Sequence, residues 1–257
     1  MGSTMNDRFQ PTRLSISSAR ITGIGDRDVN QDAFGESYAA GIGCYVMADG
    51  AGGHEGGAVA ARTVVDSALG AFTQQPALNV ETLNACVAGA SDAVVRMKLA
   101  DPTLASMHAT LAVLLVDSAK ARACWAHVGD TRVYLFRGGR VRQVTRDHSL
   151  AQQFIDAGLA KDTDPRTHAQ RSVLYAAIGV EGQPSASIQP PLDLVPGDAL
   201  LVCTDGLWER VTEATMEACL ARAMSADDWL AALCAAADST AAAGRDNFTG
   251  QVLWIAA

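Results

Sequence analysis

Apolar positions recur with two different periods in the first part of this chain. Three stretches alternate or stay apolar over the length of a strand, and they cover residues 14–24, 32–37 and 44–48. Further along, the period lengthens to that of a helix, with Val65, Ala68 and Phe72 on one face. A second helix is predicted after Asn79, whose side chain suits the N-cap position.

The remainder of the chain predicts mostly strands. Strand-length apolar runs with turn signals between them cover residues 108–117, 122–128, 132–137, 141–145, 187–189, 199–204 and 248–255. Helical spacing predicts helices at 149–158, 212–223 and 226–242. The polar stretch 162–170 contains Pro165, so we expect an irregular loop there.

The order of these elements predicts the fold class. Runs of strands joined by short turns imply antiparallel sheets, and helices in pairs imply cover on the outer sheet faces. The expected class is therefore α+β rather than a doubly wound parallel sheet. No linker rich in Pro, Gly or Ser divides the chain, so we expect a flexible leader at residues 1–12 and a single domain at 13–257.

Composition disfavours two classes of function. The net charge of −8 argues against nucleic-acid binding, which needs a basic face. No apolar run approaches the ~20 residues that span a bilayer, so no membrane insertion is expected. The six cysteines include no C-x-x-C pair and lie in apolar patterns, which is typical of reduced core residues in a cytoplasmic protein.

Four aspartates stand at the ends of apolar runs. Asp49, Asp130 and Asp205 each follow one, and Asp246 precedes the last. An Asp-Gly pair after a strand is most often a simple turn. As a set, however, converging carboxylates repel each other unless a cation holds them, and carboxylates without Cys or His partners suit Mg²⁺ or Mn²⁺. The set predicts a metal-dependent enzyme.

Six short motifs then follow in order along the chain. They are Gly25-x-Arg27-x-x-Asn30-Gln31-Asp32, residues 46–54, residues 127–132, Thr145-x-Asp147-His148-Ser149, residues 204–208 and Arg245-Asp246-Asn247-x-Thr249. Each is weak alone, but in this order the set resembles the metal-dependent serine/threonine protein phosphatases of type 2C, in their compact bacterial form. The resemblance extends from about residue 20 to about residue 253.

The resemblance implies a β-sandwich of two antiparallel sheets flanked by helix pairs, with two to three Mn²⁺ or Mg²⁺ ions at one end. The implied ligands are Asp49 bridging both ions, the carbonyl of Gly50 on the second, Asp205 and Asp246 on the first, Asp130 on a third, and Asp32 in the outer shell. Two ions about 4 Å apart can share a hydroxide that attacks phosphorus directly. Protein phosphoserine and phosphothreonine are then the expected substrates.

Further residues receive roles through the same resemblance. Arg27 matches the arginine that grips the phosphate, and its planar fork fits two phosphate oxygens. His54 is a candidate general acid, or a loop histidine in contact with solvent. Gln31 replaces the usual Glu, which weakens an outer-shell contact. Residues 150–178 match the flap beside the cleft, where Arg166 and Arg171 either contact an acidic phosphopeptide or are merely solvated.

Other readings stay open at this point. The domain could bind phosphoproteins without hydrolysis, although the intact set Asp49, Asp205 and Asp246 disfavours this. A two-metal nuclease is disfavoured by the acidic charge. The glycine-rich stretch 50–57 lacks the spacing of a nucleotide-binding loop. The expected partners are phosphorylated proteins and a cognate kinase, and the protein is expected to be a monomer; the individual substrate is not encoded in these motifs.

Overall fold

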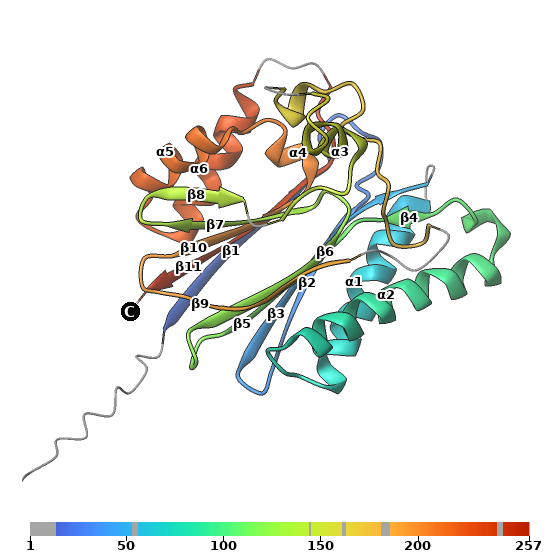
Figure 1. Ribbon diagram of the computed structural model, residues 1–257, viewed down its shortest axis with the longest axis horizontal. Coiled ribbons are helices and arrows are strands. Elements are labelled where there is room, and N and C mark those ends of the chain that lie inside the picture. Colours follow the sequence, from blue (N-terminus) through green and yellow to red (C-terminus); the bar gives the residue numbers. More distant parts are fainter. Residues whose placement is uncertain are drawn as a thin grey trace, which may run out of the picture.

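Two antiparallel sheets pack face to face, and a pair of long helices covers each outer face (Figure 1). This arrangement is seen in a computed structural model, which describes residues 14–52, 56–143, 145–160, 163–180, 186–240 and 244–256. The predicted leader at 1–12 lies outside these residues, so the domain boundaries stay a prediction. Within the described part of the chain, no helix combines the length and apolarity needed to cross a membrane.

The two sheets take strands from both halves of the chain. The first has the order β1 (Ser15–Gly23), β11 (Phe248–Ala256), β10 (Ala199–Cys203), β7 (Arg132–Arg137) and β8 (Arg140–Gln143). The second has the order β2 (Asp32–Ala39), β3 (Ile42–Ala51), β5 (Leu111–Asp117), β6 (Arg122–Val128) and β9 (Ser187–Asp193), with β4 (His108–Ala109) paired to the end of β3. Every pairing is antiparallel, as expected from the short turns.

The helices fall into two pairs and several short pieces. The long ones are α1 (Gly56–Gln74), α2 (Val80–Ala100), α5 (Glu213–Arg222) and α6 (Ala226–Asp238). The short ones are α3 (Leu150–Asp156), α4 (Asp205–Trp208) and the 3₁₀ turns η1 (Pro102–Leu104) and η2 (Pro165–Thr167). Asn79 caps α2 as predicted, since its side chain accepts a hydrogen bond from the N–H of Thr82.

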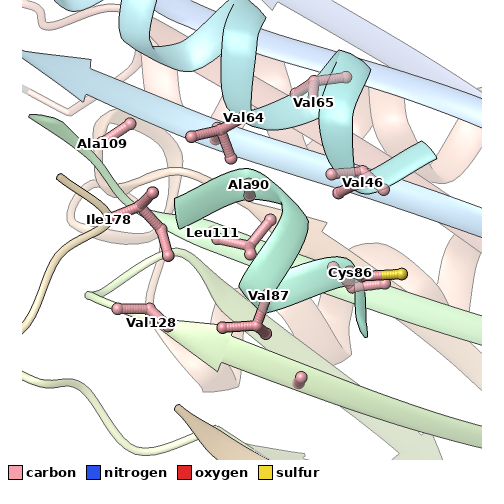
Figure 2. Close-up of a cluster of buried hydrophobic side chains, with 14 of the residues drawn as sticks. Val46, Val64, Val65, Cys86, Val87, Ala90, Ala109, Leu111, Val128 and Ile178 are labelled. Carbon is pink, nitrogen blue, oxygen red and sulfur yellow. The ribbon is translucent and has the colours of Figure 1, made fainter. Parts of the chain in front are cut away.

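The alternation along β3 explains how the layers are built. Cys44 and Val46 face α1 and α2, whereas Tyr45 and Met47 face the other sheet. Val46 lies beneath Val64 and Val65 of α1 in the cluster shown in Figure 2. Burying one such side chain contributes about 1.5–3 kcal/mol. A second helix-covered cluster, containing Trp208 and Trp229, packs the other sheet against α5 and α6.

The predicted fold class is confirmed, with four local corrections. The strand expected at 108–117 divides at Thr110, whose N–H and hydroxyl bind the backbone of Asp49 instead of continuing one ladder. The strand expected at 187–189 continues to Asp193, because β9 is an edge strand that tolerates two prolines. The helix expected at 226–242 ends at Asp238. The loop expected at 162–170 contains η2.

Candidate metal centre

A cleft of about 360 Å³ opens at one end of the sandwich. Six of the residues predicted for the site line it, namely Arg27, Asp49, Gly50, Asp130, Asp205 and Asp246. They come from the segment after β1, from β3, from the segment after β6, from α4 and from the segment before β11. Asp32 lies behind this lining, and His54 lies outside the described residues.

Asp49 is held from behind by its main chain. Its N–H donates to the hydroxyl of Thr110 at 2.8 Å, and its carbonyl accepts from the N–H of Thr110 at 2.8 Å. Thr110 in turn shares a 2.6 Å hydrogen bond with the hydroxyl of Thr131. These contacts occupy the backbone and leave the carboxylate at the end of β3 directed to the cleft that it lines.

Gly50 is fixed by close approach of the start of α1. A Cβ built on Gly50 would lie 2.0 Å from the carbonyl oxygen of Gly57, so no other residue fits there without moving the helix. The N–H of Gly50 donates to the carbonyl of Gln31 at 3.1 Å, which joins β3 to the segment before β2. The predicted ligand position is therefore sterically restricted to glycine.

Asp205 and Asp246 approach from the other sheet. Asp205 is the first residue of α4, a short helix that the sequence did not predict because four residues carry no period. Its Oδ1 is buried and has no hydrogen-bond partner among the described residues. Asp246 is 42% exposed and accepts from Nη2 of Arg27 at 2.6 Å and from the N–H of Asn247 at 2.8 Å.

Asp32 stands opposite Asp49 in the β2–β3 register. Its Oδ2 accepts hydrogen bonds from the hydroxyls of Thr204 and Thr249 at 2.9 and 2.7 Å. Its Oδ1 is buried and has no partner among the described residues. Burial raises the pKa of Asp32 to about 6, the two hydroxyls oppose this rise, and the charge of Asp246 adds to it.

The other carboxyls of the cleft are also held at raised pKa values. Burial is the largest cause for Asp49 and for Asp205, and repulsion from the neighbouring carboxylates follows, so both pKa values lie well above the usual range. Burial, and then the charge of Asp147, raise the pKa of Asp130 to about 7, although Arg132 opposes this. Each of these groups would regain its charge if a cation entered the cleft.

The donor set fits a divalent ion such as Mn²⁺ or Mg²⁺. It consists of hard carboxylate oxygens, and two of them, Oδ1 of Asp32 and Oδ1 of Asp205, are buried with no protein partner among the described residues. No three Asp, Glu, His or Cys side chains in the described part of the chain already form a closed cage. Two features therefore support binding of a divalent ion. Two buried carboxylate oxygens have no partner among the described residues, and a cation would relieve the repulsion between the carboxylates.

A buried block of three motifs supports Asp130. The carbonyl of Asp130 accepts from Nε1 of Trp208 at 3.0 Å, and the guanidinium of Arg132 lies 3.4 Å from the centre of the Trp208 ring. Arg132 also donates to both oxygens of Asp147, at 2.9 and 2.7 Å. The motifs at 127–132, 145–149 and 204–208 thus meet in one cluster, which their spacing along the chain does not reveal.

Positive charge in the cleft comes from Arg27. Of the described lining residues, it is the one with a permanent positive charge, and its side chain is 60% exposed. Contact with Asp246 raises its already high pKa. An exposed guanidinium beside a group of carboxylates can bind an anion as soon as those carboxylates are engaged elsewhere.

The two flap arginines differ in exposure and in their partners. Arg166 is only 11% exposed and donates to the carbonyls of Trp208 and Val211 and to Glu213, so its role is structural and it is not free for a phosphopeptide. Arg171 is 40% exposed, and its Nε donates to Glu209 at 2.7 Å. Neither arginine lines the main cleft.

Several lining residues were not predicted from the sequence. His108 lines the cleft because β4 pairs it with Ala51 of β3. Asn247 also lines it, and its side chain ties Gln31 to Ile24. One wall is apolar and consists of Leu174, Ala177 and Val180. The pairing of His108 with the segment after Asp49 brings it to the cleft, and no motif in the sequence signals that pairing.

Comparison with known proteins decides the family. The sequence model described as protein phosphatase 2C matches residues 23–242. The chain belongs to the protein phosphatase 2C family. The resemblance noted in its six motifs is thereby confirmed, and so is the predicted sandwich of antiparallel sheets with flanking helices.

Two relatives in this family show how similar the chain is to known phosphatases. The serine/threonine protein phosphatase PstP of Mycobacterium tuberculosis is 31% identical over 183 residues, which cover 70% of this chain but only 35% of that relative. The serine/threonine phosphatase stp of Listeria innocua is 33% identical over 180 residues, 67% of this chain and 69% of the relative. The chain therefore spans about a third of the length of PstP.

A solved structure extends the comparison to nearly the whole chain. The catalytic domain of PstP, determined in complex with two manganese ions, has a TM-score of 0.76 and 27% sequence identity to this chain. The alignment covers 95% of this chain and all of that domain.

Proposed function

We propose that this protein is a phosphatase that requires Mn²⁺ or Mg²⁺ and hydrolyses phosphoserine and phosphothreonine in other proteins. The observation that carries the proposal is the convergence of Asp49, Asp205 and Asp246 beside Arg27 in one cleft. Membership of the protein phosphatase 2C family supports it, as does the manganese complex of a relative.

The proposed roles follow from the geometry of these residues. Asp49 and the carbonyl of Gly50 would hold the ions together with Asp205 and Asp246, and Asp130 would hold a third. When bound, the ions supply an activated water and neutralise charge on the phosphoryl group. Arg27 would leave Asp246 and bind two phosphate oxygens with its fork.

Asp32 would help to hold the water that the ions activate. Its Oδ2 is fixed by two threonine hydroxyls, so Oδ1 remains to accept a hydrogen bond from a water. His54 remains the proposed proton donor to the leaving serine or threonine oxygen.

The proposed partners are phosphorylated proteins, together with a kinase that phosphorylates them. The cleft is acidic apart from Arg27 and offers no basic stripe for nucleic acid among its described lining residues. The six cysteines are all free, and four of them are buried, which supports a cytoplasmic location.

The test measures phosphate release from phosphoserine and phosphothreonine peptides. Release should require Mn²⁺ or Mg²⁺, should stop with EDTA, and should return with added Mn²⁺. Substitution of a cleft aspartate by asparagine should abolish release. Asp193→Asn is the matched control for such a variant, because it removes an equally charged but exposed aspartate outside the cleft. Full activity in a metal-free preparation would contradict the proposal. Peptide binding without phosphate release would instead favour a non-hydrolytic binding module.

A further inference from the structure

His148 joins the segment that carries Asp130 to the apolar wall of the cleft. Its N–H donates to the carbonyl of Gly129 at 2.9 Å, and its Nδ1 accepts from the N–H of Gly129 at 3.2 Å. On its other side, its carbonyl accepts from the N–H of Tyr175 at 2.9 Å. Ser149 and Leu174 form an adjacent bridge, and Leu174 lines the cleft.

The contact with Gly129 determines the state of the imidazole. A main-chain N–H can only donate, so Nδ1 of His148 must present its lone pair and the proton must be on Nε2. Nε2 lies 2.9 Å from the hydroxyl of Ser187, whose oxygen accepts a hydrogen bond from Nε2–H. The ring is 4% exposed and stacks on His127 at 4.6 Å; burial, and then His127, lower the pKa of His148 to about 4. The imidazole is thus a fixed, neutral acceptor.

The backbone of Gly129 is tightly restricted, so its N–H cannot turn to another acceptor in place of His148. It is buried, its φ is +96°, and a Cβ at this position would lie 2.6 Å from Cγ2 of Thr110. Thr110 is the residue whose hydroxyl binds the N–H of Asp49. Gly129 therefore lies between Asp130, Thr110 and His148. A shift of its peptide would move Asp130 directly, and it would move Asp49 through Thr110.

We propose that His148 is a positioning residue for turnover, which fixes Asp130 through the N–H of Gly129 and fixes the cleft wall through its own main chain. This inference rests on the proposed function, since it assigns a role within that reaction. The main-chain contacts of His148 do not depend on its side chain, whereas the contact of Nδ1 with Gly129 does.

Two substitutions of His148 test the roles of the two ring nitrogens separately. In His148→Asn the amide oxygen can lie where Nδ1 lies, and the contact to Ser187 is lost. In His148→Gln the amide lies near the place of Nε2, and the acceptor for Gly129 is lost. Ser187→Ala serves as the matched control, because it removes only the partner of Nε2.

The expected result is a difference in kcat on a phosphothreonine peptide. His148→Asn and Ser187→Ala should keep kcat near that of the wild type, whereas His148→Gln should lose about tenfold, as one misplaced hydrogen-bond acceptor implies. KM should change little, since Arg27 is not affected. Calorimetric titration with Mn²⁺ should show weaker binding at the site assigned to Asp130 in the Gln variant alone.

Equal kcat and equal Mn²⁺ titrations for the Asn and Gln variants would overturn the inference, because they would indicate a role in packing only. Melting temperatures establish that the compared variants are folded. If the Gln variant does not fold, a folded Asn variant decides alone: wild-type kcat supports the inference, and a loss of tenfold or more overturns it. A wild-type protein that releases no phosphate would instead overturn the proposed function, and this inference with it.

Discussion

Two arginine–aspartate pairs of nearly equal length have opposite surroundings in this protein. Arg132 and Asp147 meet at 2.7 Å with side chains that are 1% and 2% exposed, while Arg27 and Asp246 meet at 2.6 Å with side chains that are 60% and 42% exposed. The buried pair is bidentate, and Arg132 has further contacts with Tyr134 and Trp208. The exposed pair is a single contact.

The difference indicates which pair is permanent. Leaving one charge of a buried pair unmatched is costly, so Arg132 and Asp147 must stay together in the folded protein. An exposed pair contributes little and can be exchanged for other partners. Arg27 and Asp246 are therefore available for a phosphate and a cation respectively, whereas Arg132 and Asp147 support the segment that carries Asp130.

Breaking the buried pair should have the largest effect. Asp147→Asn leaves the guanidinium of Arg132 buried without its counter-charge, and we expect a loss of about 3–5 kcal/mol in the free energy of unfolding. Urea unfolding of the metal-free protein measures this loss. Asp193→Asn, which removes one partner of an exposed pair, should change it by less than about 1 kcal/mol. Equal effects of the two variants would contradict the comparison.

Breaking the exposed pair should affect turnover instead of stability. Asp246→Asn removes one charge that we assign to the first ion, and kcat on phosphopeptides should fall on the order of a hundredfold. The variant should unfold at nearly the same urea concentration as the wild type. Asp205→Asn should behave alike, and its metal-free form should be at least as stable, because repulsion in the cleft is relieved. Near-normal turnover at saturating Mn²⁺ would show that the ligand is misassigned.

Replacing the fork of Arg27 should have a smaller effect. Arg27→Lys keeps the charge but offers a single point of contact, so KM for a phosphopeptide should rise about tenfold while Mn²⁺ affinity stays unchanged. The same change in the buried pair, Arg132→Lys, should instead lower the melting temperature, since the bidentate contact to Asp147 is lost. Unchanged kinetics for Arg27→Lys would place this residue outside the phosphate site.

The smallest effect concerns pH. Folding raises the pKa of Asp130 to about 7, so the folded protein binds this proton more tightly than the unfolded chain does. The resulting stabilisation is present below about pH 4 and is lost as the pH rises through 7. Without metal, the wild type should therefore lose about 3–5 °C in melting temperature relative to Asp130→Asn between pH 6 and pH 8. A constant difference between the two proteins would refute the assignment of this pKa.

Much of the fold and part of the site could be predicted from local patterns. Period-two and helical spacing located most elements, and ordered motifs identified Asp49, Asp205 and Asp246, which do line one cleft. The role of each as a ligand stays a prediction. The features that were not predicted have no local signal in the sequence. The helix α4 is too short to show a period, and the division of the strand at Thr110 depends on the contact of Thr110 with Asp49.

The unpredicted parts of the site depend on contacts between distant segments. Asp147 and Arg132 pair across a turn, and Trp208 covers them from a motif that lies far along the chain. The hydroxyls that fix Asp32 belong to Thr204 and Thr249, which are 172 and 217 positions away. Such pairings follow from sheet register and packing, and a single sequence does not reveal either.

The pairing of β1 with β11 has a consequence for how the site is completed during folding. Gly23 lies opposite Phe248, and the N–H of Gln31 donates to the side chain of Asn247, 216 positions later. Contacts that close such long loops form late and slow the folding of a chain. A chain that ends before Asn247 and β11 therefore holds no complete site, because both Asn247 and the strand that β1 pairs with are missing. A fragment of this kind should bind no metal in the cleft.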